Sequence, residues 1–241
     1  LTTLQKEANK KHGFSADKTL STLQSLYEKK ITTYPRTGSR YISEDVFEEV
    51  PALLGKIGKT LPLPHNRHSV DNEKVTDHHA IIPTGETPSG LSADETTIYQ
   101  MVVHRFIEAF SPDSEEERMQ VELTDGTNTF IWKAYRSISL GWKAVQQGTG
   151  TNDAKGKEDE EQTLSVLPNL TEKEVLPLLF SEITEHKTKP KPLYTEATLL
   201  SAMENAGKEV EDVESKRAMA ECGIGTPATR ANIIETLILR D

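Results

Sequence analysis

The sequence predicts an α+β protein, because the spacing of its apolar residues changes twice along the 241-residue chain. Helical spacing dominates residues 1–115, strand-like alternation follows over 116–190, and helical spacing returns over 191–241. We therefore expect a mainly helical first domain, a β-rich middle segment, and a helical last segment of the winged-helix or helix-turn-helix type. The first boundary is expected near Asp113 to Glu117, where the period changes.

Two helices are expected before residue 31. Thr2 and Gln5 have the spacing of a capping box for the first helix, and Gly13 suits its end. The second helix is expected from Ser15 to about Lys30. Its apolar side chains recur at helical spacing and should face a core: Leu20, Leu23 and Tyr27.

Two more helices are expected between residues 43 and 110. Ser43 should cap the first of them, because acidic residues follow it in the first turn. Ser92 and Glu95 form a capping box that should start the second, which runs to about Phe110. The stretch from Lys59 to Asn72 is polar and contains prolines, so we expect a loop there.

The middle segment has the signals of strands. Arg118 to Val145 alternates β-forming residues around the turn signal Asp125-Gly126, which predicts a β-hairpin. Further strands are expected at Thr163 to Leu167 and Leu179 to Lys187, with a loop over Gln146 to Glu161. Two tryptophans suit either a core or a surface on which bases stack, and the core is favoured: Trp132 and Trp142.

The last segment predicts three helices, over Thr195 to Asn205, over Val213 to Glu221, and from Thr226 onward. Thr226 followed by proline is a strong start signal, since proline suits the first helical position. The exposed amides at such a start can hold a phosphate, and Thr229 and Arg230 would lie in its first turn. The structural alternative is an ordinary capped helix that binds nothing.

The composition bounds the classes of function. A net charge of −10 argues against a general nucleic-acid binder, although much of the acid lies in the runs Glu115–Glu117 and Glu158–Glu161. No apolar run approaches the roughly 18 residues that cross a bilayer, and no signal peptide opens the chain. A single cysteine, Cys222, excludes an internal disulfide and four-cysteine zinc clusters. We expect a cytoplasmic protein without a membrane partner, and a monomer is favoured.

Residues 31–41 read ITTYPRTGSRY and combine a phenol with two guanidinium groups. Pro35 disfavours helical backbone at Tyr34, so the phenol should project from an extended or turning segment. Arg36 and Arg40 match phosphate geometry, and a nearby cation favours the phenolate. The segment therefore suits attack on a phosphate. The alternative is an ordinary loop whose arginines are solvated or paired with carboxylates.

Three blocks together resemble the type IA DNA topoisomerases, closest to bacterial topoisomerase III. The first is the Tyr34 segment, which is similar to the active-site segment of that family. The second, DHHAIIPT at residues 77–84, resembles the family's block with a doubled histidine. The third combines YTEATLL at 194–200 with GIGTPATRANIIE at 223–235. One departure is Gly38, which stands where many members carry aspartate.

The resemblance implies that Tyr34 attacks a DNA phosphodiester and forms a 5′-phosphotyrosyl bond, so that single strands are cleaved, passed and resealed without nucleotide hydrolysis. Arg36 would neutralise charge on the phosphoryl oxygens, and His78 would bind the phosphate or move the proton. The expected partner is single-stranded DNA. The residues expected to contact it are Thr37, Ser39, Arg40, Thr226, Thr229 and Arg230.

The resemblance also implies Mg²⁺ in the full-length enzyme, bound by an acidic TOPRIM domain that precedes the tyrosine domain. We find no such cluster in a suitable place. Glu211, Asp212 and Glu214 are close in sequence, but they lie in an expected loop near the other end of the chain, so we expect no bound metal. The chain is therefore expected to be a fragment that spans the tyrosine domain, part of the β-rich gate domain and part of a helical DNA-binding domain. Alone it should not relax supercoiled DNA.

Two other classes of function remain open at this stage. One is a non-catalytic module that binds single-stranded DNA or another protein, for which replacing Tyr34 would change little. The other is a tyrosine recombinase or a relaxase, which needs dispersed arginines and histidines or a metal-binding histidine cluster, and neither pattern is visible.

Overall fold

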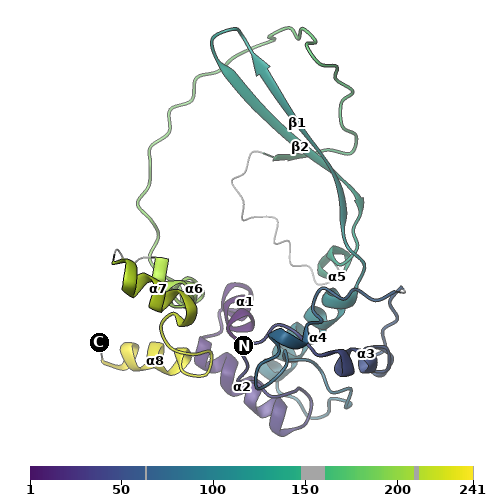
Figure 1. Ribbon diagram of the computed structural model, residues 1–241, viewed down its shortest axis with the longest axis vertical. Coiled ribbons are helices and arrows are strands. Elements are labelled where there is room, and N and C mark those ends of the chain that lie inside the picture. Colours follow the sequence, from purple (N-terminus) through teal and green to yellow (C-terminus); the bar gives the residue numbers. More distant parts are fainter. Residues whose placement is uncertain (63, 148–160, 209–211, 241) are drawn as a thin grey trace. The chain divides into compact units, whose positions relative to one another are not determined.

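The computed structural model describes residues 1–62, 64–147, 161–208 and 212–240. Helices and strands are both present, which confirms the predicted α+β class (Figure 1). By contacts the chain forms two compact units. The first comprises Leu1–Pro112, Trp142–Thr151 and Tyr194–Asp241, and the second comprises Asp113–Gly141 and Asn152–Leu193. The expected division at residues 115 and 190 into three domains stays a prediction.

The first unit is helical. Its helices are α1 (Thr2–His12), α2 (Ala16–Glu28), α3 (Glu44–Lys56), α4 (Ala93–Phe110), α5 (Lys143–Gln147), α6 (Glu196–Glu204), α7 (Val213–Cys222) and α8 (Arg230–Arg240), with short 3₁₀ turns η1 (Asn72–Lys74) and η2 (Ala206–Lys208). None of the described helices combines the length and the apolar character that crossing a membrane requires.

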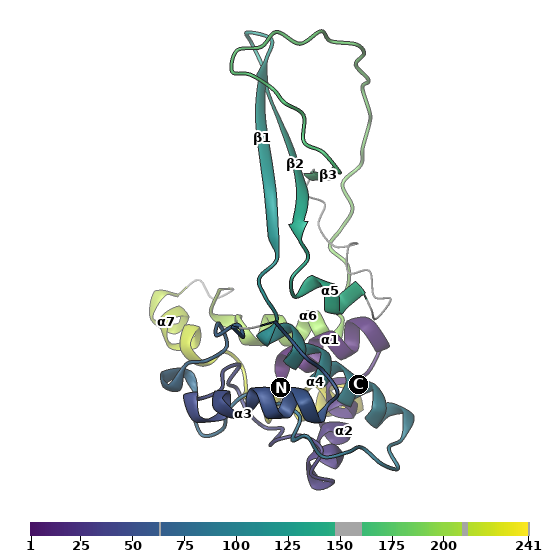
Figure 2. The same cartoon turned by 90° about the vertical axis from the view of Figure 1, so that its right-hand side faces the viewer.

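Two apolar clusters hold this unit together, and α4 contributes to both of them (Figure 2). In the first cluster α1, α2 and α4 pack with α6 and α8, around buried side chains such as Leu23, Ile98 and Leu200. In the second, α3 packs on the other end of α4. The C-terminal helices thus share a core with the N-terminal ones, although α1 ends at His12 and α6 begins only at Glu196.

Most of the predicted helix boundaries are confirmed. Gly13 ends α1 in the left-handed conformation, with φ 67°. The Ser15 hydroxyl caps α2 by accepting from the Lys18 amide. Ser92 and Glu95 form the predicted capping box of α4, and Thr195 caps α6. The hydroxyls satisfy amides that the helix starts leave unpaired, and the Gly13 amide satisfies carbonyl oxygens at the end of α1, so the local sequence signal is sufficient.

Two predictions at the N-terminal end were wrong. The first helix has Leu1 at its N-cap position and no side-chain cap, and the Gln5 side chain instead donates to the carbonyl oxygen of Ala16. A tertiary partner therefore replaces the predicted local one. Tyr27 was expected to face a core, but 39% of it is exposed, and its ring lies against another aromatic ring described below.

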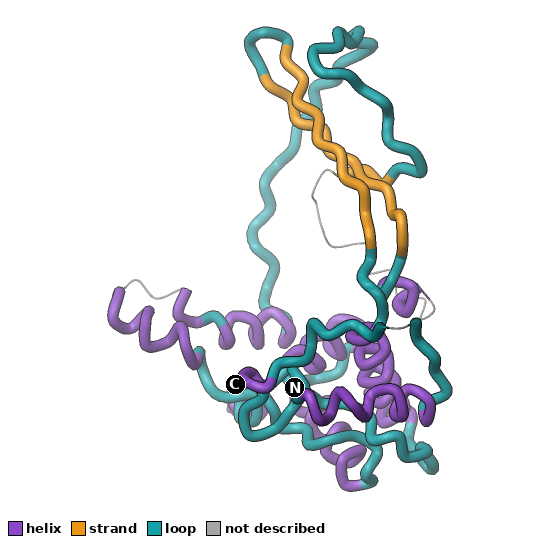
Figure 3. Tube along the Cα trace, turned by 45° about the vertical axis from the view of Figure 1, so that its right-hand side comes forward, coloured by secondary structure: helices purple, strands orange, loops and turns teal. Residues whose placement is uncertain are grey.

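The second unit is a β-sheet of order β1-β2-β3 (Figure 3). Strands β1 (Glu115–Thr124) and β2 (Thr129–Ser139) pair antiparallel across the turn at residues 125–128, which confirms the predicted hairpin. Strand β3 (Glu161–Thr163) pairs parallel with β2. Trp132 and Trp142 are half-buried and belong to neither apolar cluster, so the expectation of core tryptophans is not met.

The predicted strand at Leu179–Lys187 was wrong, and the one at Thr163–Leu167 survives only in its first residue, which ends β3. Residues 175–193 have no regular structure, and the side chain of Ile183 is 99% exposed. Alternation of apolar residues fits a strand but does not supply the neighbouring strand that its backbone needs. Most of the loop predicted at Gln146–Glu161 lies outside the described residues.

Candidate active site around Tyr34

The end of α2 directs the chain into the Tyr34 segment. The amide of Ile31 donates to the carbonyl oxygen of Leu26, and that of Lys30 donates to Tyr27. This pair of bonds is a Schellman motif, which requires a left-handed residue, and Lys30 supplies it with φ 60°. Lys30 is one of two described non-glycine residues with positive φ. The segment therefore leaves a packed helix at a fixed angle.

The first two sequence blocks pair with each other. Thr32 and Pro83 form an antiparallel bridge, and the Thr33 amide donates to the carbonyl oxygen of Ile82 at 3.0 Å. The Thr84 amide donates to Ile31 at 3.1 Å. A stretch about 50 residues away in sequence thus fixes the backbone on the N-terminal side of Tyr34.

Tyr34 contacts two other aromatic rings. The His78 ring is tilted by 40° against it, with ring centroids 4.3 Å apart. The Tyr27 ring meets it edge-on at 84°, with centroids 5.5 Å apart. Tyr34 is half-buried, and His78 is exposed. The structure therefore brings together two of the expected catalytic residues on one surface of the first unit.

Thr37 and Ser39 are buried, with exposed fractions of 3% and 9%. The Thr37 hydroxyl donates to the carbonyl oxygen of His78 at 2.8 Å and accepts from the Ser39 amide at 3.1 Å. The Ser39 hydroxyl donates to the carbonyl oxygen of Lys74 at 2.9 Å. Both hydroxyl groups, which were expected at the DNA, thus hold the loop to the His78 segment in this structure.

The cations in and just before the Tyr34 segment bond to side chains of α2 and α4. The Arg36 guanidinium donates to the Gln24 side chain at 2.6 Å, and Gln24 in turn donates to Glu28 at 3.0 Å. Lys29 pairs with Glu95 at 2.6 Å. The hydrogen bond from Lys29, together with bonds from the Ser92 amide and the Ser25 hydroxyl, lowers the pKa of Glu95 to about 2.

Arg40 is exposed. The backbone nitrogen of Leu1, just before α1, donates to the carbonyl oxygen of Thr37 at 3.2 Å. The start of α1 therefore adjoins the Tyr34 segment.

The third sequence block approaches the same segment. A Cβ atom added at Gly38 would lie 3.6 Å from the Cγ atom of Pro227. The structure places the start of α8 at Arg230, later than predicted, after a turn in which the Thr229 hydroxyl accepts from the Thr226 amide at 2.8 Å. Thr226 and Thr229 are exposed on this turn. The difference arises because backbone and side-chain hydrogen bonds between Thr226 and Thr229 close a turn before regular helix begins.

Arg230 was expected to contact DNA, but it is 5% exposed. Its guanidinium donates to the carbonyl oxygens of Ile224 at 3.0 Å and Gly225 at 3.2 Å. It also lies 3.5 Å from the carboxylate of Glu204, which pairs with Lys6 of α1 at 2.5 Å. Arg230 therefore joins α8 to α6 and the block before it, and its donors are used within the protein.

Three residues on the last turns of α2 were missed as site residues by the sequence reasoning: Gln24, Tyr27 and Glu28. Their spacing of three and four residues puts them on one helix face, which a helical-wheel reading could have found. Tyr27 was instead assigned to the core because it also follows the apolar spacing. Nothing local in the sequence shows that the chain folds back so that Tyr34 and Arg36 meet this face.

No group of three or more histidine, cysteine or acidic side chains within the described ranges could hold a metal ion. Asp212 accepts from the Ser215 amide as the cap of α7, and Glu211 lies outside the described residues. The described residues therefore do not fit a magnesium site.

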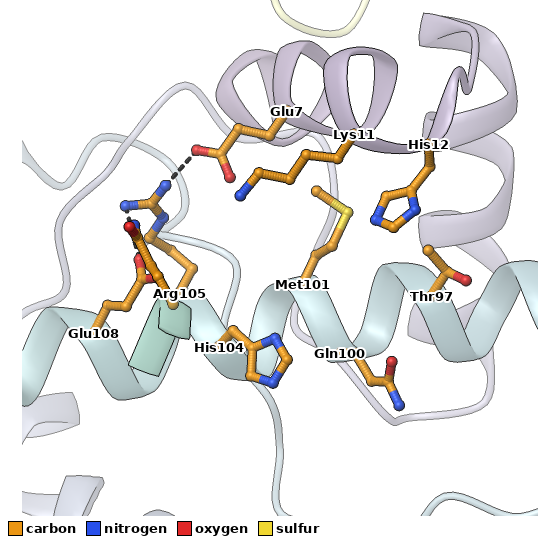
Figure 4. Close-up of a pocket in the computed structure, with 10 residues that line it drawn as sticks. Glu7, Lys11, His12, Thr97, Gln100, Met101, His104, Arg105 and Glu108 are labelled. Atoms are coloured by element: carbon orange, nitrogen blue, oxygen red, sulfur yellow. Dashed lines mark hydrogen bonds and ion pairs between the residues drawn. The ribbon is translucent and has the colours of Figure 1, made fainter. Parts of the chain in front are cut away.

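A cavity of about 160 Å³ lies between α1 and α4 (Figure 4). Arg105 lies there with Glu7 and Glu108, with which it forms ion pairs. Burial raises the pKa of Glu108 and lowers the pKa of His104. No residue of the Tyr34 segment lines this cavity, so it is separate from the candidate site.

Comparison with known proteins identifies relatives of this chain. The family model described as DNA topoisomerase matches residues 1–241. The chain is 38% identical over 98% of its length to DNA topoisomerase 3 of Shouchella clausii and 39% identical over 98% of its length to that of Bacillus anthracis. In both cases it covers 34% of the relative, so the chain spans about a third of the length of the curated relatives that it matches.

Proposed function

Because this chain belongs to the type IA DNA topoisomerase family, we propose that it supplies the nucleophile with which a longer enzyme cleaves and reseals single-stranded DNA. The observation that carries the proposal is the position of Tyr34. Its ring contacts those of Tyr27 and His78, and the Ile82 segment fixes the backbone just before it. Catalysis needs a nucleophile that is held in one orientation, and these contacts restrict the Tyr34 side chain in this way.

In the proposed reaction the Tyr34 hydroxyl oxygen attacks the phosphorus of a DNA phosphodiester. A phosphorus–oxygen bond to tyrosine forms, the bond to the 3′ oxygen of the leaving strand breaks, and the phenol proton is lost as the 3′ oxygen gains one. The covalent link conserves the phosphodiester bond, so the reverse attack by the 3′-hydroxyl reseals the strand without nucleotide hydrolysis. A second strand passes through the gap before resealing.

His78 is the residue best placed to carry the proton, because its imidazole lies against the Tyr34 ring and is exposed to solvent. Arg36 is proposed to stabilise charge on the phosphoryl oxygens. Its present partner is the neutral side chain of Gln24, so no carboxylate directly bonded to the guanidinium must be displaced when a phosphate arrives.

The DNA strand is proposed to run past the exposed residues of two blocks: Arg40, Thr226 and Thr229. Thr37 and Ser39 would act by shaping the loop, and Arg230 by shaping the start of α8, because their polar groups are bonded within the protein. Mg²⁺ is proposed to bind elsewhere in the longer enzyme, which we propose works as a cytoplasmic monomer.

The test is covalent trapping by the full-length protein that contains this chain. An oligonucleotide labelled at its 3′ end should transfer the label to the protein, because the downstream strand carries the 5′ phosphate. Tyr34→Phe should abolish transfer and leave the affinity for single-stranded DNA within about twofold, since only the attacking oxygen is removed. Undiminished transfer by Tyr34→Phe would refute the proposal and favour a module that only binds DNA.

We also propose that this chain alone is inactive in relaxation, since its described residues offer no magnesium site. A plasmid relaxation assay with Mg²⁺ compares the isolated chain with the full-length protein. Relaxation should appear with the full-length protein and be absent with the chain alone. Efficient relaxation by the chain alone would contradict this part of the proposal.

A further inference from the structure

We propose that Tyr27 is a positioning residue for the nucleophile, an inference that rests on the function proposed for Tyr34. The edge-on arrangement with centroids 5.5 Å apart and an angle of 84° lies within the preferred geometry of aromatic pairs. Such a pair resists rotation of either ring, because tilting or sliding loses the favourable contact between edge and face.

The contact has a rigid base. Tyr27 lies in the last turn of α2, next to the fully buried Leu26, and the preceding core residue Leu23 is also fully buried. The same turn is tied to α4, since Glu95 accepts hydrogen bonds from Ser25 and Lys29. The Tyr27 ring is therefore carried by backbone that cannot move without disturbing the core.

The Tyr34 ring depends on Tyr27 for support. Its other neighbour, His78, is exposed and belongs to a loop, and its imidazole has its own proposed part in proton transfer. Without the Tyr27 ring, Tyr34 would be supported by His78 and by its own backbone. The phenol would then sample rotamers in which its oxygen is out of line with the phosphorus, and fewer encounters would be productive.

The exposure of Tyr27 indicates that its ring contributes little to the core. An exposed tyrosine in a helix commonly covers apolar surface, but 39% of this residue stays exposed while its ring contacts Tyr34. Its contribution to the core is small, so removal of the ring should affect the nucleophile more than the stability of the fold. The ring of Tyr27 makes the edge-on contact, so a phenylalanine at this position should preserve it.

The experiment compares Tyr27→Phe, Tyr27→Leu and Tyr27→Ala in the full-length protein, with Tyr34→Phe as the inactive reference. The rate constant of cleavage is measured in single turnovers at saturating single-stranded oligonucleotide, and the dissociation constant is measured separately. Tyr27→Ala should slow cleavage by about tenfold to a hundredfold with the dissociation constant changed less than twofold. Tyr27→Leu should lie between, and Tyr27→Phe should stay within twofold of the unaltered protein.

The outcomes separate this inference from the one on which it rests. If Tyr27→Ala cleaves at the normal rate while Tyr34→Phe is inactive, the positioning role is wrong and the nucleophile stands. If Tyr27→Ala weakens binding and leaves the rate at saturation unchanged, Tyr27 is a DNA contact and the positioning role is again wrong. If Tyr34→Phe still forms the covalent adduct, the proposed function itself fails.

Discussion

The hydroxyl group of Thr37 donates a 2.8 Å hydrogen bond to the carbonyl oxygen of His78. This bond ties the segment that carries the nucleophile to the segment that carries the expected proton carrier, 41 residues away in sequence. The position of His78 beside Tyr34 therefore depends on a buried threonine that needs no contact with the substrate.

Thr37→Val should lower the free energy of unfolding by about 1 to 3 kcal/mol, because it leaves the Ser39 amide and the His78 carbonyl oxygen without their partner. Urea denaturation followed by circular dichroism measures the change. Thr32→Val is the matched control in the same segment. The Thr32 hydroxyl oxygen is buried without a hydrogen-bond partner among the described residues, so this change should be neutral or stabilising. Equal losses in the two variants would contradict the assignment.

Gly38→Ala should be tolerated and should raise the free energy of unfolding by up to about 1 kcal/mol, because it restricts the unfolded chain. Gly38 does not have positive φ, and its added Cβ would make an ordinary contact with Pro227 at 3.6 Å. Gly223→Ala is the contrast, since Gly223 has φ +62° and its Cβ would lie 2.4 Å from the carbonyl oxygen of Met203. Thermal unfolding should show opposite shifts of Tm for the two variants.

Glu95 should make the free energy of unfolding of the first unit depend on pH in the acidic range. The pKa of Glu95 is lowered to about 2 in the folded protein, so its contribution is complete above its ordinary pKa of about 4.5 and is lost as the pH falls towards 2. The difference in urea midpoint between the unaltered protein and Glu95→Gln should therefore be smaller at pH 3 than at pH 7. The difference in free energy of unfolding at pH 7 should be about 1 to 2 kcal/mol. A constant difference at both pH values would show that Glu95 does not titrate in this way.

Arg230→Met should destabilise the protein by about 3 kcal/mol, because it leaves two carbonyl oxygens and the Glu204 carboxylate without the guanidinium. Arg240→Met makes the same chemical change at the exposed end of α8 and should cost less than about 0.5 kcal/mol. Denaturant unfolding of both variants checks this. A stable Arg230→Met variant with weakened DNA binding would instead favour the expectation from sequence that Arg230 contacts DNA.

Arg40→Gln should reduce the dependence of single-stranded DNA binding on salt. When the logarithm of the affinity is plotted against the logarithm of the salt concentration, the loss of one phosphate contact should make the slope shallower by about 0.7. Arg40 is exposed beside the Tyr34 segment, whereas Arg105 lines the α1–α4 cavity, so Arg105→Gln should leave the slope unchanged. Fluorescence anisotropy at several salt concentrations measures both slopes in the full-length protein.

The sequence predicted features that depend on neighbours along the chain. These features follow from contacts within a few residues, and the structure has them: the helix starts near Ser15 and Thr195, the capping box of Ser92, the stop at Gly13 and the hairpin turn. The predictions that failed depend on distant partners. The Gln5 side chain bonds to Ala16 instead of capping its own helix, and the apolar stretch at Leu179–Lys187 has no strand beside it.

The candidate site shows the same division. The residue types around Tyr34 indicated phosphate chemistry, and a resemblance in three separated blocks indicated the family. Neither could show which polar groups remain available, because that depends on how the blocks meet. The Thr37 hydroxyl and the Arg230 guanidinium proved to be bonded inside the protein, and Tyr27 proved to face the nucleophile.

The carboxylate of Glu204 contacts Lys6 near the beginning of the chain and Arg230 near its end. Helices α6 and α8 are thus fastened to α1 by side chains, independently of the long connection between residues 112 and 194. Cutting that connection should therefore leave two peptides that stay associated, so a split form of the tyrosine-bearing unit can be assembled from separate halves.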